Sequence, residues 1–446
     1  METYDLLVVG GGINGAAIAR DAAGRGLAVL LVEQRDLAQA TSSASTKLIH
    51  GGLRYLEYRE FGLVRKALLE RETMLHAAPE IIRPLRFVIP QGYEARPWLV
   101  VRAGLLLYDL LARGGSLPRS RSVRLTDPAL KPGYTRGFAY WDAWVDDARL
   151  VVLNARDAAD KGATVRTRTA LAAARREGGR WLANIEDVPT GAVSQVAARA
   201  IVNAAGPWVA GVLGEKLAVR AKSGVRLVRG SHIIVPRIGP GEDALLLQQP
   251  DGRVVFAIPY EGNFTLIGTT DVSVDDPADA HISDEETDYL IAAANRYLDR
   301  PLSRHVVMGS NSGIRALYDD GASEAKEVTR DYVLELDGDG PPLLSVFGGK
   351  ITTARALAEE AMDRLAPLIG GGPAWTKGAV LPAGWSGPPA GEDFGGRLSA
   401  AQVDHFVRHE WARSADDILW RRTKAGLHVG AATVARLAAY LKGCDA

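Results

Sequence analysis

The sequence has very little cysteine and no excess of charge of either sign. Its 446 residues include a single cysteine, Cys444, which excludes an intrachain disulfide, a C-x-x-C redox pair and a cysteine-ligated iron–sulfur cluster, and favours a reducing compartment. The 53 basic residues are balanced by 53 acidic ones, so no global field draws the chain to nucleic acid and any anion site must be local. A chain of this length exceeds one simple core, and two or three domains are expected.

Long apolar segments are also missing. The most apolar run, Trp98 to Leu111, would reach as a helix roughly two-thirds of the ~30 Å hydrocarbon core, which is too short to span a bilayer. Its charged residues share one face, leaving a broad apolar face either for burial between domains or for a membrane interface beside the basic residues 119–124. Because Glu2 and Asp5 lie where a signal peptide would carry basic residues, the N-terminus is expected to belong to the fold.

The first forty residues carry a nucleotide-binding pattern. A strand-like apolar run leads into Gly10, Gly12 and Gly15 at G-x-G-x-x-G spacing, a helical stretch follows to Arg25, and a second apolar run ends at Glu33. The glycines permit a tight turn and a close approach of pyrophosphate to a helix N-terminus, and the carboxylate can accept from ribose hydroxyls. An isolated glycine triplet fits an ordinary loop, but the flanking elements favour dinucleotide binding. NAD and FAD both remain open at this point.

Residues 41–55 make the pattern more specific. They are rich in serine and threonine, yet they run directly into Leu48, Ile49 and paired glycines, which favours a structured loop near a ligand over a flexible linker. The segment resembles that of the FAD-dependent glycerol-3-phosphate dehydrogenases, respiratory flavoenzymes that pass electrons to quinone. Residues 200–208 resemble the second fingerprint of FAD-binding folds. Residues 343–353 predict a strand, a glycine turn and a helix start, and the spacing of their glycines excludes a Walker loop.

The resemblance implies an α/β fold. Its parts would be a Rossmann-like FAD-binding domain of the glutathione-reductase type, an antiparallel β substrate domain and a short C-terminal helical domain. The predicted boundaries are 1–80, 140–222 and 325–372 for the FAD-binding domain, 81–139 and 223–324 for the substrate or cap domain, and 373–446 for a truncated C-terminal helical domain. Residues 416–426 match the end of the family's helical domain, but the chain before Gln402 is shorter than is usual in the family.

The same resemblance implies FAD as the cofactor. The residues expected to contact it are Gly10, Gly12, Ile13, Asn14, Gly15, Glu33, Gln34, Thr41, Ser42, Ser45, Lys47, Leu48, His50, Gly51, Gly52, Ala205, Gly206, Gly348, Gly349, Lys350, Ile351 and Thr352.

Oxidation of a secondary alcohol requires a hydride acceptor, a base for the hydroxyl proton and positive charge for a phosphate. The resemblance supplies flavin N5 as the acceptor. His50 and His232 both remain candidates for the base, because an imidazole takes up a proton near neutral pH. Lys350 precedes a predicted helix, where it would stabilise negative charge on reduced flavin or on substrate, and Arg315 completes the predicted catalytic set.

Planar guanidinium groups can bind phosphate oxygens at two points. The residues predicted to hold the substrate, besides Arg315, are Arg54, Tyr55, Thr270 and Arg330. Ala316 stands where the family has proline, which we expect to loosen the loop. His405 and His409 lack an H-E-x-x-H carboxylate and a third ligand, so they are interpreted as surface helix residues and no metal is predicted.

The predicted reaction is the oxidation of sn-glycerol 3-phosphate to dihydroxyacetone phosphate with FAD, in glycerol metabolism, with electrons passed to ubiquinone or another membrane quinone (an activity like EC 1.1.5.3). The protein would be cytoplasmic and peripheral on the inner face of the cell membrane. A homodimer is a candidate assembly, and no nucleic-acid partner is expected. Two alternatives are an FAD-dependent oxidase that uses oxygen on glycerol 3-phosphate or an amino acid, and a non-catalytic flavin-binding protein arising from the shortened tail.

Overall fold

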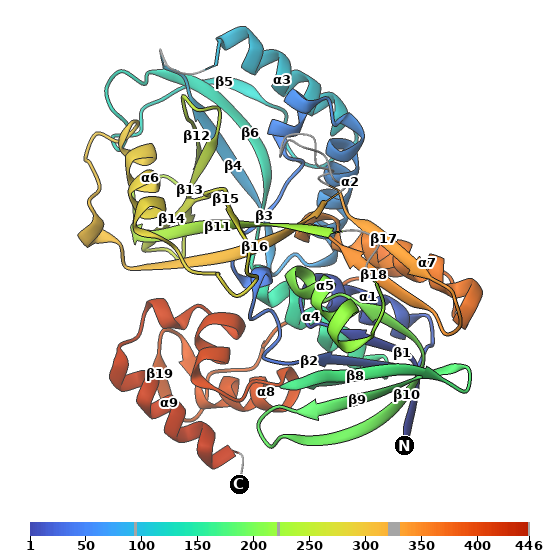
Figure 1. Ribbon diagram of the computed structural model, residues 1–446. Coiled ribbons are helices and arrows are strands. Elements are labelled where there is room, and N and C mark those ends of the chain that lie inside the picture. The colour runs from blue at the N-terminus through green and yellow to red at the C-terminus, as the bar shows by residue number, and fades with distance from the viewer. Residues whose placement is uncertain (93–95, 221–223, 320–330, 445–446) are drawn as a thin grey trace. The chain divides into compact units, whose positions relative to one another are not determined.

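The computed structural model of the protein describes residues 1–92, 96–220, 224–319 and 331–444 (Figure 1). Contacts within the chain divide it into two compact units. The first comprises Met1–Ser43, Asp146–Arg226 and Ala316–Ala446, and the second comprises Ala44–Val145 and Leu227–Arg315. The domain boundaries drawn from the sequence stay a prediction.

The first unit is built on an eight-stranded sheet whose central strands are parallel and are buried at their carboxyl-terminal ends. The path through the sheet runs β17-β18-β10-β1-β2-β7, with β17 antiparallel at one edge and the antiparallel pair β8 and β9 joined to β10. The strands are β1 (Glu2–Val9), β2 (Val29–Glu33), β7 (Thr164–Thr167), β8 (Thr169–Glu177), β9 (Arg180–Asp187), β10 (Ala192–Asn203), β17 (Val333–Asp337) and β18 (Leu343–Phe347).

Alternate side chains of these strands face two different layers. Leu6 and Val8 pack against α1 (Ile13–Gly24), α4 (Asp147–Asp160) and α7 (Ala354–Ile369). Leu7 and Val9 face the opposite layer, which contains β8, β9 and the short helix α5 (Val209–Gly211). Helices on one face of a parallel sheet and an antiparallel meander on the other confirm the predicted α/β, Rossmann-like architecture.

The second unit contains a ten-stranded sheet with the order β15-β11-β14-β13-β12-β4-β6-β3, to which β16 and β5 are added. Most of its pairs are antiparallel as predicted, whereas β4 and β12 run parallel. The strands are β3 (Leu48–Ile49), β4 (Ile82–Pro90), β5 (Arg121–Arg124), β6 (Arg136–Val145), β11 (Gly224–Pro236), β12 (Ala244–Gln248), β13 (Val254–Tyr260), β14 (Phe264–Gly268), β15 (Val272–Val274) and β16 (Gly309–Asp319).

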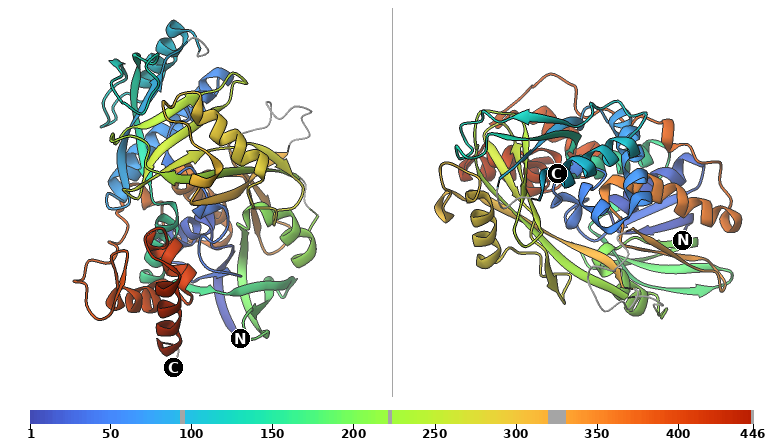
Figure 2. Two further views of the ribbon diagram at one scale, coloured as in Figure 1. Left: turned by 90° about the vertical axis from the view of Figure 1, so that its left-hand side faces the viewer. Right: turned by 90° about the horizontal axis from the view of Figure 1, so that it is seen from above.

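Helices cover both faces of this sheet (Figures 1 and 2). On one face α6 (Asp284–Asn295) packs on Leu245, Leu247 and neighbouring side chains. On the other face α2 (Phe61–Ala77) and α3 (Trp98–Leu111) pack on Phe87, Phe138 and neighbouring side chains. The sequence predicts helices over residues 61–76 and 283–298, the second one opened by a capping box of Ser283 and Glu286. The structure confirms both helices as α2 and α6, and the capping box is present.

The C-terminal part of the first unit has a small apolar core of its own. Its elements are β19 (Asp393–Gly395), β20 (Leu398–Ser399), α8 (Ala400–Glu410), a π-helical segment (Asp417–Arg422) and α9 (Ala431–Cys444). The interpretation of His405 as a surface residue is wrong, because its side chain is 13 % exposed and packs against the ring of Trp385. In the described part of the chain, every helix is too short or too polar to cross a membrane.

Candidate functional site

The glycines of the first turn are required by the backbone around them. Gly10 has φ +111°, and a Cβ there would lie 2.6 Å from the carbonyl oxygen of Ala204. A Cβ on Gly15 would lie 1.9 Å from the carbonyl oxygen of Gly10, so α1 can pack this closely on β1 only without a side chain. Helix α1 then presents its N-terminus at the turn, where Ile13 N donates to Ser42 Oγ at 3.0 Å. A helix N-terminus beside a glycine turn suits a pyrophosphate.

Glu33 lies at the end of β2 beside the same turn. Its two carboxylate oxygens accept from Gly11 N at 2.6 Å and from Arg35 N at 2.9 Å. Burial raises the pKa of Glu33, and the two backbone donors oppose that rise. The carboxylate is therefore held in place at the strand end, where it can accept from a ribose.

Two further glycine turns join the first one within this unit. Ala204 N donates to Val9 O at 2.9 Å, which places the second fingerprint next to Gly10. Asn14 Nδ2 donates to Gly348 O at 3.1 Å, and a Cβ on Gly349 would lie 2.6 Å from that nitrogen. These turns follow β1, β10 and β18, which are neighbours in the sheet, so they line its carboxyl edge, where α/β sheets bind dinucleotides.

The three glycine turns together form a glycine cradle, and one polar atom in it indicates a ligand. Asn14 Oδ1 is buried and has no hydrogen-bond partner within the described residues. A buried acceptor of this kind needs a donor, which a bound cofactor can supply. The cradle, the helix N-terminus and the carboxylate together fit a dinucleotide such as FAD.

The other residues of the first unit that were predicted to contact FAD lie on loops and short turns. Thr41 and Ser42 belong to a short 3₁₀ helix (Thr41–Ser43), and Gln34 follows β2. Ala205 and Gly206 follow β10, and Gly206 has φ +57°. Lys350 has extended backbone and immediately precedes the 3₁₀ helix Ile351–Thr353, which contains Ile351 and the buried Thr352.

In the second unit, His232 is buried among cationic groups. Its Nε2 lies 3.0 Å from Thr46 Oγ1. Burial, followed by the positive charges of Lys47 and Arg315, lowers the pKa of His232 to about 3, and the side chain of Asn311 opposes that fall. The imidazole is therefore neutral at physiological pH. Asn311 was not among the predicted residues, because an asparagine in a loop-like run carries no distinguishing sequence signal.

Arg315 is positioned by the backbone of its neighbours. Its Nη2 donates to Thr270 O at 2.9 Å, and its Nη1 lies 3.3 Å from Asp271 Oδ1. A Cβ on Gly230 would lie 2.2 Å from Arg315 Nη2, so this glycine makes room for the guanidinium group. With its side chain 40 % exposed, Arg315 has surface available for an anion.

Arg54 is the second candidate for an anion contact in this unit. It lies in the 3₁₀ helix Leu53–Tyr58, which also contains Tyr55. The Nε of Arg54 is buried and has no hydrogen-bond partner in the part of the chain that the structure describes. An unpaired, buried guanidinium donor is costly unless a ligand completes it.

The remaining residues of this unit that were predicted to contact substrate or FAD lie in different local environments. The hydroxyl of Thr270 accepts from Ser231 N and donates to Glu286, so its hydrogen bonds are made within the protein. Gly51 N donates to the hydroxyl of Tyr108 at 2.9 Å. Gly52 has φ +76°, Leu48 is a buried residue of β3, and Ser45 Oγ accepts from Lys47 N. His50 is half-buried after β3, and Arg330 lies outside the described residues.

The chain matches known flavoproteins over almost its whole length. The family model described as FAD dependent oxidoreductase matches residues 5–355. A glycerol-3-phosphate dehydrogenase of Pseudomonas aeruginosa is 48 % identical over 99 % of this chain and 95 % of its own. The aerobic glycerol-3-phosphate dehydrogenase of Escherichia coli is 45 % identical over 99 % of this chain and 98 % of its own. A D-erythritol 1-phosphate dehydrogenase of Brucella abortus is 48 % identical over 100 % of this chain and 98 % of its own.

A solved structure agrees with these relatives. The glycerol-3-phosphate dehydrogenase of Bacillus halodurans, complexed with FAD, has a TM-score of 0.71 and 25 % identity, and the match covers 99 % of this chain and 94 % of that one. Together with the glycine cradle, this similarity makes FAD the cofactor of the protein. The chain belongs to the FAD-dependent oxidoreductase family and, within it, to the glycerol-3-phosphate dehydrogenases.

Proposed function

We propose that the protein oxidises sn-glycerol 3-phosphate to dihydroxyacetone phosphate. The observation that carries this proposal is the full-length similarity, at 48 % and 45 % identity, to the dehydrogenases of P. aeruginosa and E. coli. FAD, when bound, supplies the acceptor for the hydride that leaves the substrate carbon. The first unit holds the cofactor through its three glycine turns and Glu33.

The second unit supplies the groups that the substrate requires. Arg54 and Arg315 offer guanidinium donors to the phosphate, and two-point binding would orient the alcohol carbon. His232 is one of two candidate bases. Lys47 and Arg315 help to keep its pKa low, so a dianionic phosphate beside Arg315 would offset that charge and raise the basicity of the imidazole. His50 remains the other candidate for accepting the hydroxyl proton.

The substrate can be tested by anaerobic reduction of the flavin, and the electron acceptor by the reoxidation that follows. Glycerol 3-phosphate added to the yellow holoenzyme should bleach the flavin band, and ubiquinone with a short side chain should restore it faster than oxygen does. D-Erythritol 1-phosphate is the second candidate substrate, favoured by the 48 % identity to the B. abortus enzyme. A larger kcat/KM for the erythritol ester would replace the proposed substrate. Rapid oxygen-dependent peroxide formation would instead indicate an oxidase, and an unbleached flavin a non-catalytic protein.

A quinone acceptor requires contact with a membrane, and we propose that α3 provides it. Four large apolar residues of this helix are exposed, namely Leu99 (79 %), Val100 (57 %), Leu106 (51 %) and Leu110 (60 %). Arginines exposed at and beyond its C-terminal end, Arg113, Arg119, Arg121 and Arg124, would favour anionic headgroups. An apolar helix face with flanking basic residues is typical of a segment that lies in the bilayer interface. The cytoplasmic face of the cell membrane and a homodimeric state remain predictions.

Replacing Leu106 and Leu110 by glutamate is expected to lower binding to phosphatidylglycerol vesicles by more than about tenfold. Each leucine that enters the apolar part of the bilayer contributes roughly 1.5–3 kcal/mol to the binding free energy. Co-sedimentation measures the bound fraction. Val193→Glu is the matched control, since this residue is 61 % exposed on β10 in the other unit and should leave vesicle binding unchanged. Equal binding of the double variant and the wild type would exclude α3 as the contact.

A further inference from the structure

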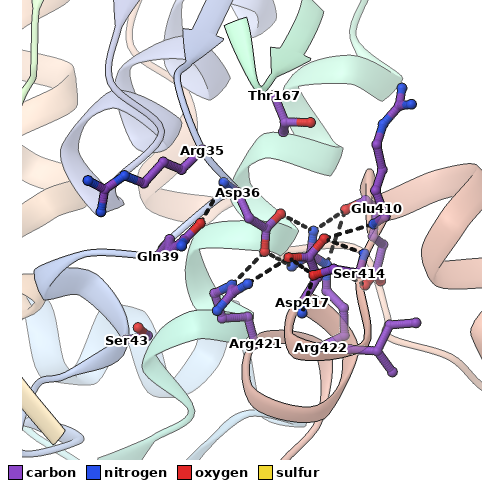
Figure 3. Close-up of polar contacts among 12 residues, drawn as sticks. Arg35, Asp36, Gln39, Ser43, Thr167, Glu410, Ser414, Asp417, Arg421 and Arg422 are labelled. Carbon is purple, nitrogen blue, oxygen red and sulfur yellow. Dashed lines mark hydrogen bonds and ion pairs between the residues drawn. The ribbon is translucent and has the colours of Figure 1, made fainter. Parts of the chain in front are cut away.

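The loop that follows Glu33 is held by arginines from the C-terminal part of the chain (Figure 3). Asp36 is 1 % exposed. Its carboxylate accepts from both terminal nitrogens of Arg422 at 2.7 Å and from Arg421 Nε at 2.6 Å. Arg422 is itself fully buried, and it donates through Nε and Nη2 to Glu410 O. The pair is therefore a two-point contact with no freedom to move into solvent.

Asp36 occupies the middle of a short segment whose two ends both contact the first glycine turn. On one side of it, Glu33 accepts from Gly11 N at 2.6 Å. On the other side, Ala38 N donates to Gly11 O at 3.0 Å. A carboxylate fixed between these two contacts fixes the direction in which the segment leaves β2, and with it the position of Glu33.

A second contact links the same segment to the C-terminal part of the chain through Arg168. Arg168 N donates to Arg35 O at 2.9 Å, and the Arg168 guanidinium group pairs with Asp417. Asp417 also pairs with Arg421 at 2.6 Å. Glu410 pairs with Arg149 and so links the C-terminal helix α8 to α4. The network consequently runs without a break from the C-terminal helices to the loop beside Glu33.

A network of this kind is poorly explained by stability alone. Replacing a buried ion pair by apolar residues of similar volume is often neutral or stabilising, whereas removing one partner leaves a buried charge uncompensated. A two-point arginine–carboxylate pair does give geometric specificity. The segment that this pair holds follows Glu33, and in this fold class the carboxylate at that position faces the ribose of the cofactor.

We propose that Arg422, assisted by Arg421, is a positioning residue for the adenosine half of FAD. It acts through Asp36, which sets the place of Glu33 and of the Gly11 peptide. The C-terminal segment 416–424 thereby becomes part of the cofactor site although it lies far from the nucleotide fingerprint in sequence. The inference depends on FAD binding at the glycine cradle and is independent of which alcohol is oxidised.

The test compares FAD with FMN, which lacks the adenosine half. In full-length apo-protein, Arg422→Gln is expected to raise the Kd for FAD about tenfold or more and to leave the Kd for FMN unchanged, both measured by flavin fluorescence well below Tm. Arg436→Ala is the matched control, because this C-terminal arginine makes an exposed pair with Glu392. It should change neither constant. If Arg422→Gln lowers Tm but leaves both constants as in the wild type, the arginine has only a structural role and the proposal is overturned.

A double-variant experiment tests the route through Glu33. In a Glu33→Gln background, Arg422→Gln should weaken FAD binding no further, because the residue that it positions is already impaired. Fully additive losses would overturn the assigned route. Should Arg422→Gln fail to fold, Asp36→Asn combined with Arg422→Gln leaves no unpaired charge and decides the question. This double variant must also weaken the binding of FAD more than that of FMN. Equal weakening of the binding of both ligands contradicts the proposal.

Discussion

Gly15→Ala is expected to yield a protein purified almost without FAD. The added Cβ would lie 1.9 Å from Gly10 O, and neither atom can turn aside, because the oxygen is part of the backbone and the Cβ is bonded directly to it at Gly15. Helix α1 must then move away from β1, and its N-terminus moves with it from the place where it would meet the pyrophosphate. Overpacking of this kind costs typically 1–3 kcal/mol and occasionally more. If about 3 kcal/mol of this cost is lost from FAD binding, the Kd for FAD rises roughly a hundredfold.

The ratio of flavin to protein absorbance measures this effect directly. Gly214→Ala is the matched control, because Gly214 belongs to a helical segment of the same unit and its Cβ would meet nothing within 4 Å. It should retain the wild-type flavin content. Circular dichroism of both variants shows whether the fold persists. A Gly15→Ala protein with full flavin content would contradict the close packing of α1 on β1 described here.

Local sequence patterns predicted the parts of the fold that depend on neighbours along the chain. The strand, turn and helix around Gly10 are confirmed as β1, the glycine turn and α1, and the capping box at Ser283 opens α6. Each of these patterns joins residues only a few positions apart. A glycine that must adopt positive φ, or a serine that accepts from the third residue of its helix, is visible in sequence because its cause is local.

Contacts between distant segments were not predictable in this way. Asp36 and Arg422 are 386 positions apart, and neither residue differs locally from an ordinary surface charge. Strand β4 was also missed, because Arg83, Pro84 and Arg86 interrupt its apolar pattern, although it pairs with β6 over nine residues. Such elements form through tertiary pairing, which overrides the periodicity of a single segment.

Arg315→Ala is expected to raise KM for glycerol 3-phosphate roughly ten- to a hundredfold. Hydrogen bonds to charged groups contribute about 1.5–3 kcal/mol each, and the proposed contact with the phosphate is lost in the enzyme–substrate complex and the transition state alike. The guanidinium group donates to Thr270 O and lies in the space left by Gly230. Lysine at position 315 keeps the charge but loses the planar fork, so its KM should fall between those of alanine and wild type.

Two comparisons make this result specific to the phosphate. Glycerol, which lacks the phosphate, should be an equally poor substrate of the wild type and of Arg315→Ala, because the contact that the variant removes is never made. Arg304→Ala is the matched control, since Arg304 is an exposed arginine of the same unit paired with Asp284 and Asp288, and its KM should stay at the wild-type value. Because Arg315 also lowers the pKa of His232, the alanine variant should raise that pKa above about 3. An unchanged KM for glycerol 3-phosphate would remove Arg315 from the substrate site and leave Arg54 as the remaining guanidinium candidate.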